Sequence, residues 1–515
     1  MGIARIIAKN TFFNFIISAS DVIVSLVIGI VLARRLGPDQ YGTYSFLMWA
    51  LTLGALITNL GLNSLVTRFI AEALGQGNAD EAKGLVRISL SIRFIVVLLA
   101  IVVVVILSAF GGHLLGDPAN RTYFVLLAFA LLPNVLNYLI NSVFSGFQRY
   151  DYGAYTMLGS TPLRAILVIT LAVLGFGIGP LLIANMIGWV AGVLIGFFLL
   201  RRLIPLKALL SAPRLSPATS KKALRYALTM AAILGVSYLL WNQAEVLFLR
   251  LWCSAKDVGF YRLAFQLPTM AMGLVPAVFA GVLLPAISEQ VGRGDLEKIR
   301  AIYLTSARYL MIMGLPLAVA LIALARPLVY LLWGADYASS ITLMQIVAVP
   351  LSMSAICGGS AAVIYALNKP SFDLKAGLVL GIMSIGLDLW LVPKYGVMGA
   401  AIGSSIPRLL VLPVYSVFVS RNIQAAWPWA DTVKIASACG VMGLALFVLQ
   451  AHTGTIPSLV LAVPVGLAIY TGALLALRVV RQQDVQMFGR VQHYVPSPLR
   501  KAYVSLLDLA MRTAR

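Results

Sequence analysis

Ionisable side chains inside apolar runs are the residues of this sequence whose types and positions could do chemistry. Within a membrane-crossing segment such a group costs about 2.5–3.5 kcal/mol, so it usually faces a cavity or a partner. Arginine binds phosphate oxygens through two parallel N–H bonds, whereas a carboxylate binds a cation or balances a guanidinium. Three acids and three arginines meet the description: Asp21, Glu245, Asp388, Arg164, Arg308 and Arg408.

Arg164 and Arg408 are predicted to bind the anionic part of a substrate. Each lies one or two residues after a proline in a long apolar segment, far from the ends where a guanidinium reaches water. Asn242 and Gln243, which precede Glu245, are the uncharged candidates for the same cavity. A pyrophosphate gripped by paired arginine N–H groups is the chemistry that these residue types favour.

The acids Asp21, Glu245 and Asp388 are candidates for binding a coupling ion, proton or sodium, or for balancing the arginines when substrate is absent. The alternative for all these charged residues is a set of buried ion pairs that fixes helix register. Arg308 lies near the inner end of its segment, so we expect its guanidinium to extend to the membrane interface. Asp388 lies near an outer end, where it can reach water.

No catalytic or metal-binding pattern accompanies these groups in the sequence. The three histidines, at positions 113, 452 and 493, are scattered, and the three cysteines do not form a disulfide framework. We therefore expect no catalytic residues, no metal and no cofactor.

The elements that position these residues are predicted to be membrane-spanning helices. The chain has 515 residues, is 60% hydrophobic and 11% charged, and has a mean hydropathy of +0.93, which no soluble globular core accommodates. About fourteen spans are predicted, at roughly 11–36, 42–70, 88–110, 121–147, 154–175, 180–203, 222–250, 258–288, 302–326, 341–367, 372–393, 396–420, 431–451 and 457–479. They leave almost no extramembrane mass for a soluble catalytic domain.

The net charge of +21 follows the predicted topology. With the N-terminus inside and alternating spans, most lysines and arginines fall in inside-facing segments, as the positive-inside rule requires. The even span count returns the C-terminus to the cytosol. The basicity therefore does not indicate a nucleic-acid partner.

An internal repeat organises these spans. A shift of 217 residues, from position 42 to position 259, aligns Tyr41-Gly42-Thr43-Tyr44 with Val258-Gly259-Phe260-Tyr261, and it carries Glu72, Gly75 and Gly77 onto Glu289, Gly292 and Gly294. Six spans separate the copies, so both copies run the same way through the membrane. Two parallel repeats around a central cavity are typical of an alternating-access carrier.

The predicted divisions follow from this repeat. They are an N-terminal six-helix lobe at 1–203, a cytosolic linker at 204–221, a C-terminal six-helix lobe at 222–421, two additional transmembrane helices at 422–479, and a cytosolic tail with a basic amphipathic helix at 480–515.

Several segments resemble the polysaccharide-transporter (Wzx-type flippase) family of the multidrug/oligosaccharidyl-lipid/polysaccharide exporter superfamily. They are Leu32–Gly42, Gly61-Leu62-Asn63-Ser64, the Glu72–Lys83 loop and the Tyr395–Ala400 turn. The resemblance implies a MATE-like fold and a flippase, not an enzyme, in the bacterial cytoplasmic (inner) membrane. It would move an undecaprenyl-pyrophosphate-linked oligosaccharide repeat unit to the outer leaflet for O-antigen or exopolysaccharide biosynthesis. Its implied partners are membrane lipids and glycan polymerase or assembly proteins.

Two rival functions come from the same superfamily. A cation-coupled multidrug exporter should have a net acidic cavity, whereas arginines match acids three to three within the spans. A flippase for the peptidoglycan lipid precursor has the same span number, and the sequence does not separate it from the first hypothesis. A membrane enzyme such as a glycan polymerase would need a large outside loop, and the predicted outside connections are short.

Overall fold

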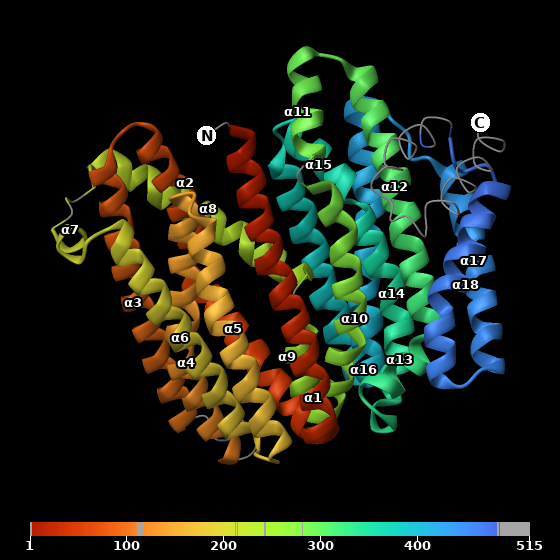
Figure 1. Ribbon diagram of the computed structural model, residues 1–515, viewed down its shortest axis with the longest axis horizontal. Helices are drawn as coiled ribbons and strands as arrows, with labels where there is room; N and C mark the ends of the chain where they lie inside the picture. Colours follow the sequence, from red (N-terminus) through yellow and green to blue (C-terminus); the bar gives the residue numbers. More distant parts are fainter. Residues whose placement is uncertain are drawn as a thin grey trace. The chain divides into compact units, whose positions relative to one another are not determined.

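The computed structural model describes residues 3–110, 118–211, 213, 215–241, 244–280, 282–481 and 484 (Figure 1). Every regular element in these ranges is a helix, as predicted. By length and composition alone, nine helices in the described ranges could cross a membrane, or up to ten with a bent pair counted as one span. The chain is therefore a multi-pass membrane protein.

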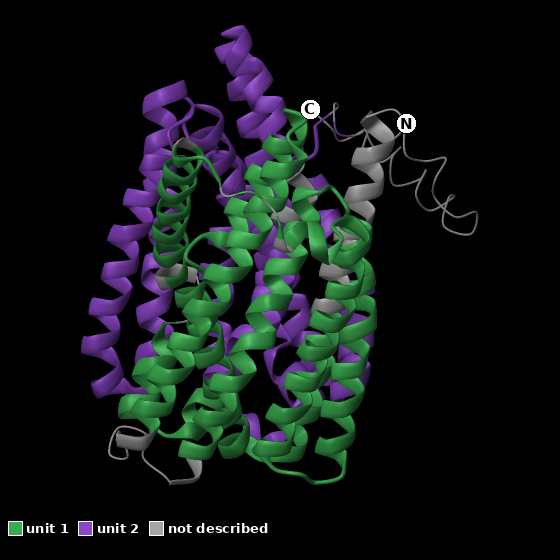
Figure 2. Ribbon diagram, turned by 90° about the vertical axis from the view of Figure 1, so that its left-hand side faces the viewer, with its two compact units in different colours: residues 1–259 green, residues 260–515 purple. Residues whose placement is uncertain are grey.

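Two compact units divide the chain between Gly259 and Phe260 (Figure 2). Unit 1 contains α1 (Ile3–Asn59), α2 (Leu62–Gly75), α3 (Ala79–Phe110), α4 (Pro118–Gly146), α5 (Tyr150–Val173), α6 (Ile178–Leu203), α7 (Leu206–Leu210), α8 (Pro217–Trp241), α9 (Glu245–Trp252) and the start of α10 (Ala255–Ala280). In Figure 1, α3, α4, α5 and α6 run alongside one another, and α6 packs against both α4 and α5.

Unit 2 holds the rest of α10 and the remaining helices: α11 (Leu283–Arg293), α12 (Leu296–Ala323), α13 (Ala325–Leu332), the 3-10 helix η1 (Ala335–Tyr337), α14 (Ser339–Ile356), α15 (Gly358–Ala366), α16 (Pro370–Ile423), α17 (Trp429–His452) and α18 (Thr455–Ala476). Helix α12 contacts α14 and α17, and α17 pairs with α18. The core of this unit is therefore built around α12.

Two helices are broken at glycines where the sequence predicts two spans each. Helix α16 has 54 residues, about 80 Å of α-helix, which exceeds the thickness of a bilayer. Its backbone leaves helical geometry at Gly396, the first residue of the predicted span 396–420 and three residues after the end of the span 372–393. Helix α1 breaks in the same way at Gly37, which has φ 72° and precedes Pro38. Each break therefore divides one long helix into two spans.

The lobe boundaries stay a prediction, because the compact units and the repeat divide the chain by different criteria. Helix α8, at the start of the predicted second lobe, packs against α1 and α2 within unit 1. The first turns of α8 are tied to the same unit, since Thr219 donates to Glu81 and Lys222 pairs with Glu72 at 2.5 Å. Most of the predicted tail at 480–515, including its amphipathic helix, lies outside the described residues.

The repeat-related glycines Gly42 and Gly259 lie against each other. A Cβ atom added to Gly259 would approach the Gly42 nitrogen to 3.3 Å and the Pro38 carbonyl oxygen to 2.7 Å. A Cβ atom added to Gly42 would lie 3.0 Å from the Gly259 nitrogen and would overlap the carbonyl oxygen of Ala255. Positions 38 and 255 differ by the same 217 residues, so the two contacts are equivalent under the repeat. The segments 38–42 and 255–259 are thus related by a local twofold.

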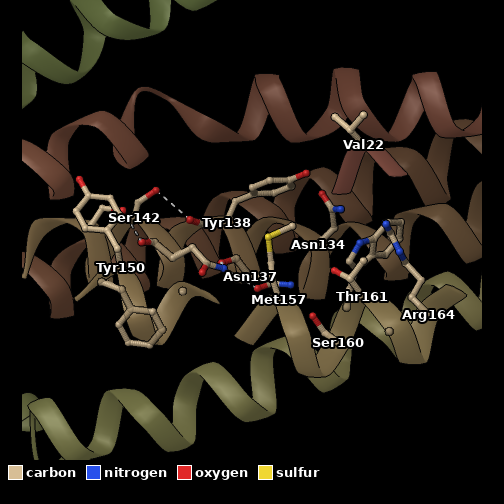
Figure 3. A pocket seen from close by; sticks show the side chains of 16 residues that line it. Val22, Asn134, Asn137, Tyr138, Ser142, Tyr150, Met157, Ser160, Thr161 and Arg164 are labelled. Atoms are coloured by element: carbon tan, nitrogen blue, oxygen red, sulfur yellow. Dashed lines mark hydrogen bonds between the residues drawn. The ribbon is translucent and has the colours of Figure 1, made fainter. Parts of the chain in front are cut away.

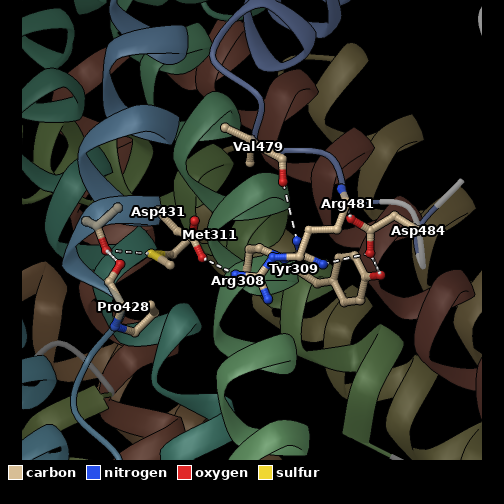
Figure 4. A network of polar contacts seen from close by, with 9 residues as sticks. Arg308, Tyr309, Met311, Pro428, Asp431, Val479, Arg481 and Asp484 are labelled. Carbon is tan, nitrogen blue, oxygen red and sulfur yellow. Dashed lines mark hydrogen bonds and ion pairs between the residues drawn. The ribbon is translucent and has the colours of Figure 1, made fainter. Parts of the chain in front are cut away.

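A buried polar cluster fixes the end of the described chain to α12 (Figure 4). The Arg308 guanidinium pairs with the Asp484 carboxylate at 2.6 Å, and the two side chains are 2% and 5% exposed. Arg308 also donates to the Val479 carbonyl oxygen, and the Tyr309 hydroxyl donates to Asp484. The prediction that Arg308 extends to the interface is therefore wrong, because a partner 176 residues away in the sequence satisfies its charge inside the protein.

Candidate functional site

Two adjoining cavities in unit 1 are the candidate site. The amide cavity, of about 480 Å³, is lined by α4, α5 and α6 with Val22 of α1 (Figure 3). The arginine cavity, of about 470 Å³, is lined by Arg93 and by residues from α1 through α6 and α8. The two share four lining residues: Asn134, Tyr138, Arg164 and Trp189. Arg164, a predicted substrate-binding residue, therefore belongs to both.

Two glycines of α6 provide the space that the polar side chains occupy. A Cβ atom added to Gly188 would come within 2.5 Å of the Arg164 Cβ and 3.1 Å of its Cα. One added to Gly192 would overlap the amide nitrogen of Asn137. The spacing of four residues, which in the sequence indicates close helix packing, here also places Arg164 and Asn137 in the wall of the amide cavity.

Gly188→Ala is expected to lower the free energy of unfolding by about 1–3 kcal/mol, because the added methyl meets α5 backbone and the helices must separate. Gly179→Ala in the same helix is the matched control, since its Cβ would meet Tyr123 at an ordinary 3.6 Å. The thermal unfolding midpoints of both variants in detergent check this. Equal midpoints would contradict the packing argument.

Arg93 is a cavity residue that the sequence analysis missed. Its side chain is 1% exposed, in the predicted span 88–110. Its guanidinium donates to the Thr58 carbonyl at 2.7 Å, to Asn59 Oδ1 at 2.9 Å and to Asn63 Oδ1 at 2.7 Å. The two asparagines lie four residues apart in the apolar span 42–70, and this amide pair is the signal that could have indicated a buried partner.

These bonds hold together a break between α1 and α2. The two helices meet at an angle of 45°, with Leu60 and Gly61 in the left-handed region at φ 48° and 72°. A break exposes carbonyl groups that no water satisfies inside a membrane. Arg93 satisfies one carbonyl, and a cation at a helix C-terminus also complements the helix dipole. A Cβ atom at Gly61 would overlap the Ala227 carbonyl of α8. Glycine is therefore required there both for its left-handed backbone and for this close contact.

Arg93→Met is expected to lower the free energy of unfolding by about 2–3 kcal/mol, because the Thr58 carbonyl and two amide oxygens lose a charged donor. Ser89→Ala, one turn earlier in α3 and fully buried, is the control and should change stability little. Chemical denaturation in mixed micelles measures both. An Arg93→Met variant as stable as Ser89→Ala would show that the break does not depend on this guanidinium.

The far end of the amide cavity lies near Tyr150, at the start of α5 (Figure 3). Arg149 donates to both carboxylate oxygens of Asp151, at 2.9 Å each, and its guanidinium lies 3.7 Å from the centre of the Tyr152 ring. The hydrogen bond to Asp151 raises the pKa of Arg149 above its usual value. The Asp151 charge is therefore neutralised locally, and Asp151 does not line the cavity.

The other predicted site residues are placed as follows. Arg408, in unit 2, is 2% exposed, donates to the Ser404 carbonyl at 2.7 Å and lies 5.4 Å from the centre of the Phe265 ring. Asp388, which was expected to reach water, is instead fully buried, with its Oδ1 2.5 Å from the position of a Cβ on Gly403. Glu245 is 1% exposed in the first turn of α9. The three do not line either cavity of unit 1.

Three predicted residues fall outside what the structure describes. Asn242 and Gln243 lie between the described ranges, and Asp21 lies in α1 without a described side chain. Their roles stay predictions. Among the described residues, no group of three His, Cys, Asp or Glu side chains could hold a metal ion.

The sequence matches the family model described as polysaccharide biosynthesis protein over residues 7–291, more than half of its length. The chain belongs to this family. The similarity of this polysaccharide biosynthesis protein family member to a curated relative extends over most of both chains. The probable low-salt glycan biosynthesis flippase of Haloferax volcanii is 21% identical over 462 residues, which cover 87% of this chain and 92% of the relative.

The fold of this polysaccharide biosynthesis family member is that of known transporters. The lipid II flippase MurJ, in its inward closed conformation, matches 90% of this chain and 98% of its own with a TM-score of 0.72 and 15% identity. An inward-facing multidrug resistance MATE family transporter of the MOP superfamily matches 78% and 94%, with a TM-score of 0.67 and 17% identity. The predicted family and MATE-like fold are confirmed. The curated relative and the two matched structures are, by their names, flippases or transporters.

Proposed function

We propose that this protein flips an undecaprenyl-pyrophosphate-linked oligosaccharide from the cytosolic to the outer leaflet by alternating access. The observation that carries the proposal is the charge of the candidate site. Arg93 and Arg164 both line the arginine cavity, so two guanidinium groups border the same space. Such a site favours an anion, and arginine suits pyrophosphate because its planar N–H groups match phosphate oxygens.

The position of Arg164 suits a substrate loaded from the predicted cytosolic side. Helix α5 begins at Tyr150, in a turn that the positive-inside rule places in the cytosol. Arg164 lies fourteen residues further on, roughly 21 Å along the helix axis at 1.5 Å per residue. The pyrophosphate would therefore be held near mid-membrane, with the glycan towards the cytosol before it is flipped. The setting proposed is a bacterial inner membrane, with both termini cytosolic.

The site argues against an exporter of organic cations. Two guanidinium groups border the arginine cavity, and they would repel an organic cation placed there. The glycan-flippase relative supports a glycan-lipid substrate. The similarity to MurJ makes the peptidoglycan precursor lipid II the second candidate substrate, since it also carries a pyrophosphate-linked sugar. A coupling proton or sodium ion, with Asp21, Glu245 or Asp388 as its ligands, belongs to the same proposal.

Deleting the gene in its host tests the proposal. Loss of surface polysaccharide, with undecaprenyl-linked oligosaccharide accumulating on the cytosolic side, is the expected result, and the wild-type gene should restore export. Accumulation of lipid II with unchanged surface polysaccharide would assign the second substrate. Unchanged lipid intermediates with increased sensitivity to cationic toxins would overturn both and favour a drug exporter.

A further inference from the structure

Three asparagines on one face of α4 form a neutral polar wall in the amide cavity. Asn134, Asn137 and Asn141 are spaced by three and four residues, which places them on the same side of the helix. All three line the cavity, with Asn134 only 7% exposed. Three amides in one membrane helix need a reason, because an amide that exchanges water for hydrocarbon without a hydrogen bond is costly.

Helix-to-helix hydrogen bonding does not supply that reason. The Asn141 amide nitrogen donates to the carbonyl oxygen and to Oδ1 of Asn137, both at 2.9 Å and both within α4. Among the residues that the structure describes, Asn137 Nδ2 and Asn141 Oδ1 therefore have no hydrogen-bond partner. Asn185 shows the contrasting arrangement, since it lines neither cavity and its amide bonds the Tyr44 hydroxyl of α1 at 3.0 Å.

Three serine hydroxyls line the same cavity, and each of them also hydrogen-bonds within its own helix. Ser142, Ser145 and Ser160 each donate to a backbone carbonyl one turn earlier, at 2.9, 3.1 and 2.8 Å. A hydroxyl that donates in this way keeps its oxygen lone pairs as acceptors. The wall therefore offers both amide donors and oxygen acceptors, and it carries no formal charge away from Arg164.

The arrangement is directional. In Figure 3, Arg164 lies at one end of the cavity, and Ser142 and Tyr150 lie at the other, with Asn137 and Met157 between them. Tyr138, which is 60% exposed, adds an aromatic side chain to the same wall. An anion held at Arg164 would place whatever is attached to it along the amides. Neutral donors and acceptors match the hydroxyl and N-acetyl groups of a sugar, each of which both donates and accepts.

We propose that the wall formed by Asn134, Asn137 and Asn141 is a subsite for the uncharged sugars next to the phosphate of the substrate. The inference rests on the proposed function, because it takes the group at Arg164 to be the pyrophosphate of a glycan lipid. The subsite makes the protein recognise the glycan as well as the lipid phosphate. It selects sugars by hydrogen bonding, because an amide desolvated by a substrate that lacks the matching hydroxyl is left unpaired.

The test compares two probes on the purified full-length chain in detergent. One is undecaprenyl pyrophosphate, and the other is the same lipid with its oligosaccharide, extracted from the deletion host. The dissociation constant of the bare lipid divided by that of the glycan-bearing lipid measures how much the glycan contributes to binding. Asn137→Ala and Asn141→Ala should each lower this ratio by about 2- to 10-fold, as one neutral hydrogen bond is lost, with the affinity for the bare lipid unchanged.

Two control variants make the result specific. Asn185→Ala removes a buried amide of the same unit that does not line the cavities, and it should leave the ratio unchanged. Arg164→Ala should weaken both probes and also preserve the ratio. Thermal unfolding confirms that each variant is folded.

Each failure has its own signature. A wild-type ratio of one, an unchanged ratio in the asparagine variants, or an equal drop in Asn185→Ala would overturn the subsite while the flippase assignment stands. Wild-type protein that binds neither lipid would overturn the proposed function itself, and the subsite with it.

Discussion

Replacing Arg164 by alanine is expected to abolish export of the lipid-linked glycan at normal protein levels. Arg164 lines both cavities, and α6 places a glycine directly against it so that the side chain fits. One hydrogen bond between a guanidinium and a charged oxygen contributes about 1.5–3 kcal/mol, which corresponds to about 10- to 150-fold in affinity. Loss of a bidentate contact falls at or beyond the upper end of that range.

Surface polysaccharide and binding of undecaprenyl pyrophosphate measure this effect. Arg164→Lys keeps the charge but not the two parallel N–H groups, so it should fall between wild type and Arg164→Ala. Arg201→Ala, in the exposed last turn of α6, is the matched arginine control and should export normally. Wild-type export by a well-expressed Arg164→Ala variant would remove this residue from the substrate path.

Asp484→Ala is expected to lower the free energy of unfolding by about 3–5 kcal/mol, the largest stability effect that we predict. The change leaves the Arg308 guanidinium buried at 2% exposure with its counter-ion gone, and an uncompensated buried charge carries a penalty of that size. The Tyr309 hydroxyl loses its acceptor as well. Unfolding midpoints and protease resistance of the purified chain report the loss.

The neighbouring pair between Arg481 and Asp431 provides the control. The Arg481 side chain is 49% exposed, so Arg481→Ala should cost no more than about 1 kcal/mol. The double variant Arg308→Met with Asp484→Leu should regain most of the stability lost in Asp484→Ala, because it removes both charges together. If Asp484→Ala and Arg481→Ala unfolded alike, the buried pair would not be the anchor of this segment.

Most of the fold is predictable because hydropathy and charge act locally. Long apolar runs specify helices, and glycines such as Gly37 and Gly396 mark where one helix becomes two. The break at Leu60–Gly61 was not predicted, because it lies inside the apolar run 42–70 and depends on Arg93 from another helix. Hydropathy does not register a break whose carbonyls are satisfied by a distant side chain.

The candidate site was predictable only in part, because a sequence shows which charges are buried but not which face a cavity together. Arg164 was predicted to face a cavity from its position within a span, and it lines both cavities, while its role in substrate binding stays a prediction. Arg93 was missed although its span was correct, and Arg308 was assigned to the interface because its partner Asp484 lies far along the chain. The neutral asparagines of α4 were missed for another reason: amides carry no charge, and the room for Asn137 in the cavity wall depends on the missing side chain of Gly192.

The reciprocal contact of Gly42 and Gly259 bears on how the molecule originated. If the two repeats descend from one shorter chain that worked as a symmetric pair, these two positions were once a single residue meeting its own copy on the twofold axis. At such a point every side chain is present twice and collides with itself, so only glycine allows the backbones to touch. Fusion of the two copies freed most positions to diverge. At these two positions the backbone contact still prevents divergence. A methyl group on Gly42 would overlap the carbonyl oxygen of Ala255, and one on Gly259 would crowd that of Pro38.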